Sequence, residues 1–285
     1  MRCEVNPACG REEDFNITPA VNKKRVMVVG GGIAGMEAAR IARLRGHEVT
    51  LFEKTGQLGG HLLEASVPQF KQKTKALLAW ANRQLDKERV SIELGTEVTS
   101  DLVREIKPDV IILAVGSDYL IPKVKGCNNS CVCTAGDVLL GNSSVGNRVM
   151  IIGGGLVGCE TALYIADELG KKVTVVEMLD EILPETENLC KIVLTESLQQ
   201  SGVEVHKGFH LEKIMNGSVI GTNNEGKRRQ IETDTVILAT GLGAREKTVA
   251  LFNSLAPEVD TIGDCAKARN IYSAFEDAWR VALAI

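Results

Sequence analysis

The sequence is poor in aromatic residues, which make up 4% of its 285 residues. Sites for single-stranded nucleic acid rely on aromatic rings on which the bases stack, and a formal net charge of −4 does not favour a polyanionic partner. No apolar run is long enough to cross a bilayer, and the first residues do not resemble a signal peptide. We therefore expect neither a nucleic-acid nor a membrane partner, and a cytoplasmic location.

Paired redox cysteines are also missing. The eight cysteines are scattered without the rhythm of a disulfide scaffold, and no Cys-x2-Cys or Cys-x4-Cys pair occurs, which suits a reducing compartment. The nearest cluster is Cys127, Cys131 and Cys133. It could bind a metal or form a disulfide, but it lacks a fourth ligand at the spacing of a structural zinc site, so loop thiols are the favoured interpretation. Cys159 and Cys265 are interpreted as small packing residues, although Cys265 could also lie near a bound ligand.

Candidate acid–base groups are few. The chain has four histidines, and neither a Ser-His-Asp arrangement nor a pair of carboxylates rises above background. We therefore assign no catalytic side chain. His61, which follows Gly59-Gly60, is the one histidine beside a segment expected to contact a ligand. A hydrogen bond from His61 to that ligand or to the backbone is favoured over proton transfer.

Two glycine-rich loops dominate what is present. Each follows an apolar run, opens a helix-like stretch and precedes a second apolar run that ends in an acid. Glu53 lies 23 residues after the first glycine of its loop, and Glu177 lies 24 residues after the first glycine of the other, close to the dinucleotide-binding pattern. The glycines of the pattern are Gly30, Gly32 and Gly35 in the first loop, and Gly153, Gly155 and Gly158 in the second.

The spacing has a physical reason. A helix N-terminus offers unpaired N–H groups and a positive dipole end to a diphosphate. The first glycine makes the tight turn, the second lets the diphosphate approach, and the third lets helix and strand pack closely. The acid can accept hydrogen bonds from ribose hydroxyls. Because Glu177 would repel a 2′-phosphate and no arginine follows it directly, NADH is favoured over NADPH.

The pattern predicts an α/β fold with two Rossmann-like dinucleotide-binding domains, the second inserted in the first. We expect a linker at 1–22, a first domain at 23–123 plus 252–285, and a second domain at 124–251. Hairpin turns are predicted at Asn216-Gly217 and at 224–226. Further strands are predicted at 90–94, 110–115, 203–207, 235–239 and 259–262, and helices at 71–86, 189–201 and 271–285.

Together with Ala114-Val115-Gly116, Ala239-Thr240-Gly241 and Gly263-Asp264, the two loops resemble the flavoproteins with two dinucleotide-binding domains. The resemblance covers residues 24–285 and implies FAD in the first domain and NAD(P)H in the second. Asp264 is expected at a helix entrance, beside the ribityl and phosphate groups of FAD. The residues expected to contact the nucleotides are Gly30, Gly32, Ile33, Ala34, Gly35, Glu53, Lys54, Gly59, Gly60, His61, Ala114, Gly116, Gly153, Gly155, Leu156, Val157, Gly158, Glu177, Thr240, Gly241, Gly263 and Asp264.

A narrower resemblance lies at the start of the chain. Residues 3–12 (Cys-Glu-Val-Asn-Pro-Ala-Cys-Gly-Arg-Glu) resemble the end of the iron-sulfur segment in the 2,4-dienoyl-CoA reductase and trimethylamine dehydrogenase family. Gly59-Gly60 and residues 135–139 are similar to that family as well. The resemblance implies a missing N-terminal FMN barrel of the old yellow enzyme type. It also implies that Cys3 is the fourth ligand of a [4Fe-4S] cluster, which one cysteine alone cannot hold.

These observations predict an NADH-dependent flavoprotein module. It would pass hydride from NADH to FAD and, in a full-length protein, electrons on to a cluster and an FMN barrel that reduces an unsaturated substrate. Two alternatives stay open. One is a structural module that binds ADP without hydride transfer, and the other is a stand-alone NADH:redox-protein reductase.

Overall fold

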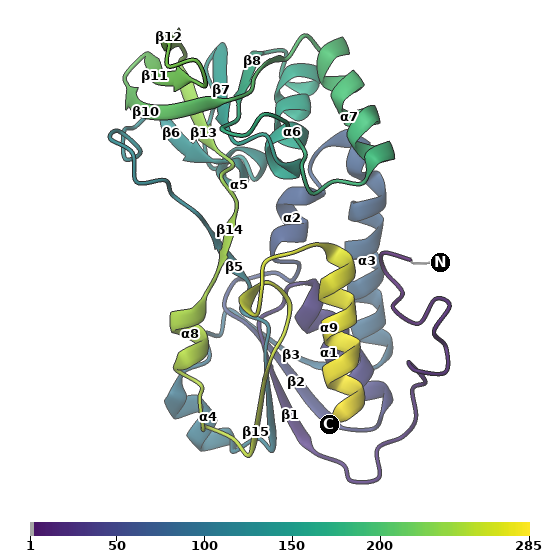
Figure 1. The fold of residues 1–285 in the computed structure, drawn as a ribbon. Helices are drawn as coiled ribbons and strands as arrows, with labels where there is room; N and C mark the ends of the chain where they lie inside the picture. Colours follow the sequence, from purple (N-terminus) through teal and green to yellow (C-terminus); the bar gives the residue numbers. More distant parts are fainter. Residues whose placement is uncertain (1–2) are drawn as a thin grey trace. The chain divides into compact units, whose positions relative to one another are not determined.

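The computed structural model describes residues 3–285 and divides into two compact units (Figure 1). The first unit contains the described residues up to 63, together with 73–118 and 243–285. The second unit contains 64–72 and 119–242, so its main segment interrupts the first unit in sequence. At the crossings, β5 (Ser117–Tyr119) and β14 (Leu242–Ala244) form a two-stranded sheet.

The first unit is built on a five-stranded parallel sheet. Its strand order is β15-β4-β1-β2-β3, with β1 in the centre of the sheet. The inner strands are continuous apolar runs, as expected for strands that are covered on both faces. The bounds are β1 (Arg25–Val29), β2 (Glu48–Glu53), β3 (Ser91–Leu94), β4 (Val110–Leu113) and β15 (Glu258–Thr261).

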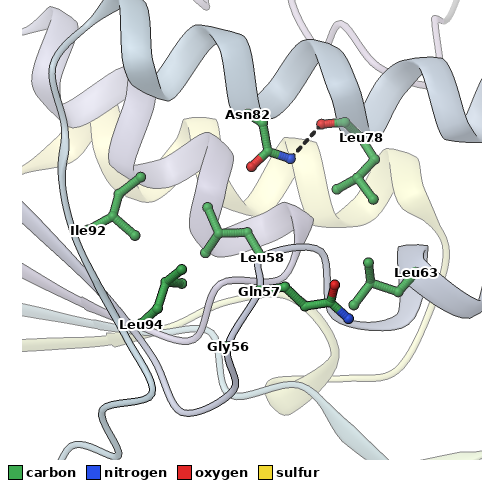
Figure 2. A pocket seen from close by; sticks show the side chains of 8 residues that line it. All are labelled: Gly56, Gln57, Leu58, Leu63, Leu78, Asn82, Ile92 and Leu94. Carbon is green, nitrogen blue, oxygen red and sulfur yellow. Dashed lines mark hydrogen bonds between the residues drawn. The ribbon is translucent and has the colours of Figure 1, made fainter.

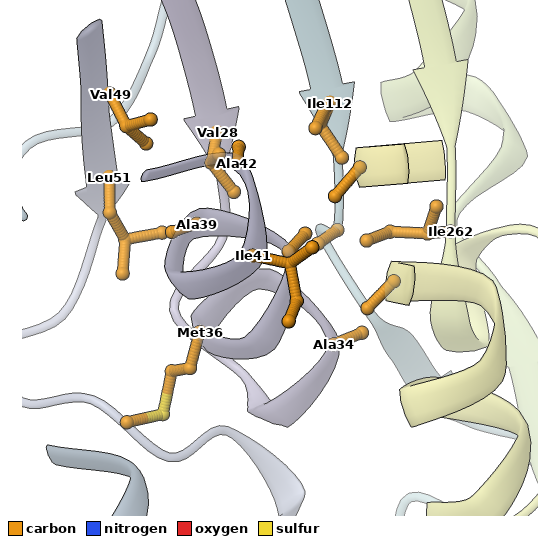
Figure 3. Close-up of a cluster of buried hydrophobic side chains, with 14 of the residues drawn as sticks. Val28, Ala34, Met36, Ala39, Ile41, Ala42, Val49, Leu51, Ile112 and Ile262 are labelled. Atoms are coloured by element: carbon orange, nitrogen blue, oxygen red, sulfur yellow. The ribbon is translucent and has the colours of Figure 1, made fainter. Parts of the chain in front are cut away.

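Helices supply two apolar cores, one on each face of this sheet. The larger core contains buried residues of α1 and α9, with α1 packed between the sheet and α9 (Figure 3). Alanines at 34, 38, 39 and 42 let α1 approach both neighbours closely. The smaller core includes Val103 of α4 and Phe252, which follows α8. The helices are α1 (Ile33–Leu44), α2 (His61–Ala65), α3 (Gln72–Lys87), α4 (Ser100–Ile106), α8 (Glu246–Ala250) and α9 (Ile271–Ala284). A short 3-10 turn, Gln69–Lys71, belongs to the second unit.

The segment before β1 packs on the first unit although it forms no helix or named strand within its described residues 3–22. The ring of Phe15 meets Trp279 of α9 edge to face, with the ring centroids 5.9 Å apart. Arg11 lies over the Phe15 ring and forms an ion pair of 2.9 Å with Glu276. The sequence predicts a linker here that resembles the end of an iron-sulfur segment, and it does not predict these contacts.

The second unit repeats the parallel sheet and adds an antiparallel one. Its parallel strand order is β6-β13-β7-β8-β9, and β10, β11 and β12 form a three-stranded antiparallel sheet. The expected turns at 216–217 and 224–226 connect these three strands. The strands are β6 (Val132–Thr134), β7 (Arg148–Ile152), β8 (Lys172–Val176), β9 (Glu204–His206), β10 (Phe209–Met215), β11 (Ser218–Asn223), β12 (Arg228–Glu232) and β13 (Thr235–Leu238).

Two apolar cores flank the parallel sheet of the second unit. One contains buried residues of α6 and α7, and the other places Phe209, Ile214 and Val219 of the antiparallel sheet against the parallel strands. The helices are α5 (Ala135–Leu139), α6 (Leu156–Leu163) and α7 (Asn188–Gln200). A π-helical turn (Tyr164–Glu168) continues α6, which the sequence did not predict. Among the described residues, no helix is long and apolar enough to cross a membrane.

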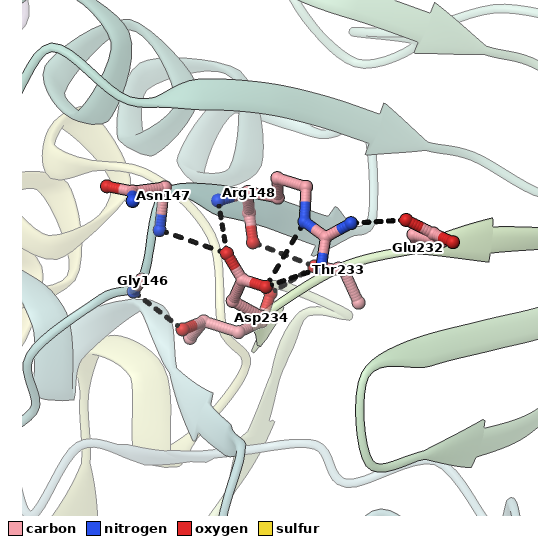
Figure 4. A network of polar contacts seen from close by, with 7 residues as sticks. Gly146, Asn147, Arg148, Glu232, Thr233 and Asp234 are labelled. Carbon is pink, nitrogen blue, oxygen red and sulfur yellow. Dashed lines mark hydrogen bonds and ion pairs between the residues drawn. The ribbon is translucent and has the colours of Figure 1, made fainter.

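A polar network fixes the start of β7 (Figure 4). The carboxylate of Asp234, just before β13, accepts hydrogen bonds from the backbone N–H of Arg148 (2.9 Å) and from its guanidinium (2.7 Å). Arg148 holds the pKa of Asp234 below its usual range. The first unit has the same arrangement, because Asp109, just before β4, accepts from the backbone N–H of Arg25 at 2.7 Å. Both central strands are thus anchored at the end opposite their glycine-rich loop.

Candidate dinucleotide sites

The first glycine loop (residues 30–35) and the second glycine loop (residues 153–158) share one backbone geometry. Gly30 has φ +108° and Gly153 has φ +113°, in the region that favours glycine. A methyl group on either would lie 2.3 Å from a carbonyl oxygen, that of Ala114 or that of Ala239. The first glycine of each loop is therefore required by conformation and by space.

The third glycines serve close packing. A methyl group on Gly35 would lie 1.9 Å from the carbonyl oxygen of Gly30, and one on Gly158 would lie 2.0 Å from that of Gly153. These distances are far below van der Waals contact. Any side chain there would push the helix away from the turn that precedes it.

The second glycines face open space. A methyl group on Gly32 or Gly155 would meet no atom within 4 Å. Each is the N-cap of its helix, α1 or α6, where no side chain caps the N–H groups and no acid lies in the first turn. An open, uncapped helix N-terminus fits a diphosphate, so the residues present suit the nucleotides that the sequence predicts.

The two predicted acids hold their loops. Glu53, which is 9% exposed, accepts a hydrogen bond from the Gly31 N–H at 2.7 Å and, through its other oxygen, from the Thr55 N–H at 2.8 Å. Glu177 is also 9% exposed and accepts from the N–H groups of Gly154 at 2.6 Å and Leu179 at 2.9 Å. The Glu53 oxygen that accepts from the Thr55 N–H also accepts from the Thr55 hydroxyl at 2.8 Å, so the oxygen facing Gly31 is the one that keeps capacity for a ribose hydroxyl. Lys54, which follows the first acid, is exposed.

The segment Gly59-Gly60-His61, predicted to contact a nucleotide, lies directly on the first glycine loop. Gly59 donates its N–H to the carbonyl oxygen of Gly31 at 2.8 Å, and a methyl group on Gly60 would approach Cα of Gly32 to 3.1 Å. His61 then begins α2, and its Nε2 lies 3.3 Å from the carbonyl oxygen of Ser117. A backbone contact of His61 is one of the two interactions that the sequence analysis favoured.

A cavity of about 510 Å³ opens beside residues 56–58 (Figure 2). Its walls are mainly leucine and isoleucine side chains, with two amides, Gln57 and Asn82. The Asn82 amide donates to the carbonyl oxygen of Leu78 at 2.9 Å. No ionisable side chain lines it, so it offers no acid or base for chemistry. The lining residues are Gly56, Gln57, Leu58, Leu63, Leu78, Asn82, Ile92 and Leu94.

Asp264 lies beside the start of α1. A methyl group on its neighbour Gly263 would approach Cβ of Ala34 to 2.8 Å, which ties this turn to the first glycine loop. The expected position at a helix entrance needs correction. Asp264 sits in a 3-10 turn, Gly263–Cys265, and α9 begins later, capped by the side chain of Asn270. The intervening residues need their own turn, which helical periodicity does not reveal.

Arg245 is a residue that the sequence analysis missed. Its guanidinium donates to the carbonyl oxygen of Val115 at 2.7 Å, next to Gly116, and to Asp118 at 2.7 Å. Arg245 lowers the pKa of Asp118 through this hydrogen bond. The segment Ala114-Val115-Gly116, which comes within reach of the first glycine loop, is thus held by a residue far along the chain. No local pattern marks that pairing.

In the second unit, Thr240 and Gly241 lie between β13 and β14 and contact the backbone of Leu120. The Thr240 hydroxyl donates to the carbonyl oxygen of Leu120 at 2.5 Å, and the Leu120 N–H donates to Gly241 at 3.0 Å. At the start of α6, Leu156 and Val157 are exposed.

Glu160, two residues after the second glycine loop, was also not foreseen. Burial raises the pKa of this carboxyl, although the ammonium group of Lys71 forms an ion pair with it. The corresponding residue after the first glycine loop is Glu37, which is buried. Its carboxylate forms an ion pair of 2.7 Å with Arg40 and accepts a hydrogen bond from Trp279 Nε1 at 2.6 Å. Each helix therefore carries a carboxylate near its start, buried at Glu37 and 17% exposed at Glu160.

Cys159 and Cys265 are buried packing residues, as the sequence predicts. Burial raises the pKa of Cys159 to about 12, and its thiol donates to the carbonyl oxygen of Gly154. Cys265 is buried too, and its thiol contacts the carbonyl oxygen of Ile262 at 3.1 Å. Cys131 and Cys133 contact different backbone oxygens. Within residues 3–285, no group of three or more potential ligands, including Cys3, could hold a metal ion.

Comparison with known proteins places this geometry in a family. The model described as pyridine nucleotide-disulphide oxidoreductase matches residues 24–276. Cinnamate reductase of Clostridium sporogenes is 38% identical over 286 residues, which cover 99% of this chain and 42% of that enzyme. NADH oxidase of Thermoanaerobacter brockii is 37% identical, covering 99% and 44%. The structure of a 2-naphthoyl-CoA reductase superposes with a TM-score of 0.96 at 33% identity, covering 100% and 44%.

These relatives are longer proteins, and the chain spans less than half of their length. The family implies FAD and NAD(P)H as cofactors, and both glycine loops suit them. The chain belongs to the pyridine nucleotide-disulphide oxidoreductase family, as an NAD(P)H-dependent flavin oxidoreductase domain that corresponds to the C-terminal FAD- and NAD(P)-binding region of longer reductases.

Proposed function

We propose that the first unit binds FAD, that the second binds NADH, and that the chain is the electron-input module of a longer reductase. The observation that carries this proposal is the repeated site. In each unit, the N-terminal N–H groups of a helix have no side-chain cap, and the N-cap glycine faces open space. A carboxylate held by backbone N–H groups lies next to this loop.

In the first unit, the backbone N–H groups of Ile33 and Ala34 would receive the diphosphate of FAD, and Glu53 its adenosine ribose. Gly59, Gly60 and His61 lie on the open side of the same loop. Asp264 would accept hydrogen bonds from the ribityl hydroxyls. In the second unit, Leu156, Val157 and Glu177 would hold NADH in the corresponding manner.

The chemistry supplied by the bound nucleotides is hydride transfer from nicotinamide C4 to flavin N5. The chain's own task in that step is to bind and orient the nucleotides, because hydride transfer itself needs little acid–base help. We therefore assign no catalytic side chain. The inert thiols at Cys159 and Cys265 agree with a mechanism that uses no cysteine.

NADH is proposed over NADPH because of the residues at the end of β8. The Glu177 carboxylate lies where a 2′-phosphate would have to approach, and the next residue, Met178, carries no charge and is 61% exposed. The relative from Thermoanaerobacter brockii is named an NADH oxidase. No cation follows the acid to offset the repulsion.

The length of the relatives supports a further part of the proposal. The match covers less than half of each relative, so more than half of each relative lies outside it. That remainder leaves room for an FMN barrel and a [4Fe-4S] segment. In such a protein Cys3 would be the fourth cluster ligand, and electrons would pass from FAD to the cluster and then to FMN. The eight cysteines are free thiols, in agreement with a cytoplasmic location.

An anaerobic absorption experiment tests the proposal. The purified chain is loaded with FAD, freed of excess flavin, and titrated with NADH or NADPH. We expect a flavin band near ~450 nm that NADH bleaches at lower concentration than NADPH does. Bound flavin that NADH leaves oxidised would contradict hydride transfer. A chain that binds ADP but retains no flavin would favour the structural ADP-binding module instead.

A further inference from the structure

Three side chains from distant parts of the first unit meet in one hydrogen-bonded line. His61 begins α2, Ser117 begins β5, and Asp264 lies in the turn before α9. The Nε2 atom of His61 lies 3.2 Å from the Ser117 hydroxyl oxygen, and that oxygen lies 3.2 Å from Oδ2 of Asp264. The contacts join residues 56 and 147 positions apart in sequence.

The direction of this line follows from what each group can do. A carboxylate only accepts, so the hydroxyl of Ser117 donates its single proton to Asp264. The hydroxyl oxygen must then accept from His61. The carbonyl oxygen of Ser117, 3.3 Å from the same Nε2, is also only an acceptor. Both contacts require the proton of the imidazole to be on Nε2.

The line ends on a carboxylate that is held on both sides. Oδ2 of Asp264 accepts from Ser117, and Oδ1 accepts from the backbone N–H of Arg269 at 3.3 Å. Ser117 is 1% exposed, so water does not compete for its hydroxyl. With both oxygens engaged in fixed directions, the plane of the carboxylate is set before any ligand arrives.

We propose that His61 and Ser117 are positioning residues that orient Asp264 toward the flavin half of the dinucleotide. This inference rests on the proposed FAD site in the first unit. His61 and Ser117 act through Asp264, whereas the first glycine loop and Glu53 act on the ADP half. Removal of the line should therefore weaken binding of FAD and leave binding of ADP unchanged.

The test compares three variants of the full chain. Ser117→Ala removes the donor to Asp264, His61→Leu removes the donor to Ser117, and His61→Gln keeps an N–H donor on a side chain of similar reach. Dissociation constants for FAD are measured by quenching of flavin fluorescence, and those for ADP by calorimetry with the second unit saturated with NAD⁺, so that ADP reports on the first unit. ADP binding also reports whether each variant has folded.

We expect Ser117→Ala and His61→Leu to weaken FAD binding about tenfold, because each removes a hydrogen bond that leads to a charged group. Their ADP binding should equal that of the unmodified chain, and His61→Gln should bind FAD within about twofold of it. Unchanged FAD affinity in the first two variants would overturn the proposal. So would equal losses for FAD and ADP, which indicate a merely structural role. If the unmodified chain bound ADP and no FAD, the proposed function itself would fail.

Discussion

The two glycine loops are two versions of one construction. In each unit an arginine at the start of the central strand contacts an aspartate before the neighbouring strand, Asp109 or Asp234. At the other end, the loop N–H is held by a glutamate at 2.7 Å in the first unit and 2.6 Å in the second. The contacts at both ends of the central strand are thus repeated in the two units.

The helices that follow the loops differ. α1 has 12 residues and lies between the sheet and α9, whereas α6 has 8 and continues into a π-helical turn. Glu37 pairs with Arg40 within its own helix, and its counterpart Glu160 pairs with Lys71 from another segment. The comparison teaches that the glycine loops share one set of contacts, while the residues that follow each loop distinguish the two units.

The largest effect is expected at the third glycines. Gly35→Ala and Gly158→Ala place a methyl group 1.9 Å and 2.0 Å from a carbonyl oxygen, so each should destabilise its unit by about 3 kcal/mol. Urea unfolding followed by circular dichroism measures this. Gly56→Ala is the matched control, because a methyl group there meets nothing within 4 Å. Equal stability of all three variants would show that the packing argument is wrong.

Replacing Glu37 in α1 and Glu160 in α6 should affect stability in different ways. Glu37→Gln leaves Arg40, which is 13% exposed, without its charge partner and should lower the free energy of unfolding by about 3 kcal/mol. Glu160→Gln should instead change the pH dependence. The raised pKa of Glu160 gives stability at low pH that is lost as the pH rises through the folded-state pKa, and the variant should not show this loss.

Urea unfolding at a series of pH values from about 5 to 8 gives the free energy of unfolding of both glutamate variants. The same loss of stability for Glu37→Gln and Glu160→Gln at every pH would contradict the proposed difference between the two glutamates.

The smallest effect concerns the residue after each acid, Lys54 in the first unit and Met178 in the second. Met178→Arg should strengthen binding of NADP⁺ about tenfold, because a guanidinium can pair with the 2′-phosphate. Met178→Gln, which adds no charge, is the control. Calorimetry with NAD⁺ and NADP⁺ gives both affinities. An arginine that left NADP⁺ binding unchanged would place the ribose site elsewhere.

Local patterns predicted much of the fold. The predicted strand at 235–239 and the predicted helix at 189–201 each agree with the structure to within one residue at either end, because buried strands and half-buried helices impose their periods on the sequence. The strand predicted over 110–115 ends at Leu113. The chain turns there at Gly116, which has φ +75°. Apolar character alone could not mark that end.

Contacts between distant residues could not be predicted in this way. Arg245 reaches Val115 across 130 positions, and Arg11 reaches Glu276 across 265. A single sequence contains no signal that pairs such residues, because any arginine can satisfy any carboxylate that the fold brings near it. The glycine loops were predictable since their chemistry is local, whereas the line from His61 through Ser117 to Asp264 required the structure.

The most direct test is a binding exchange between the two second glycines. Gly32→Ala and Gly155→Ala each add a methyl group in open space, so both variants should keep the stability of the unmodified chain. FAD and the non-reducing probe NAD⁺ are then titrated into each. We predict that Gly32→Ala weakens FAD alone and that Gly155→Ala weakens NAD⁺ alone, each by about tenfold or more. If one variant weakened both ligands, or neither variant weakened either, the assignment of one dinucleotide to each unit would be contradicted.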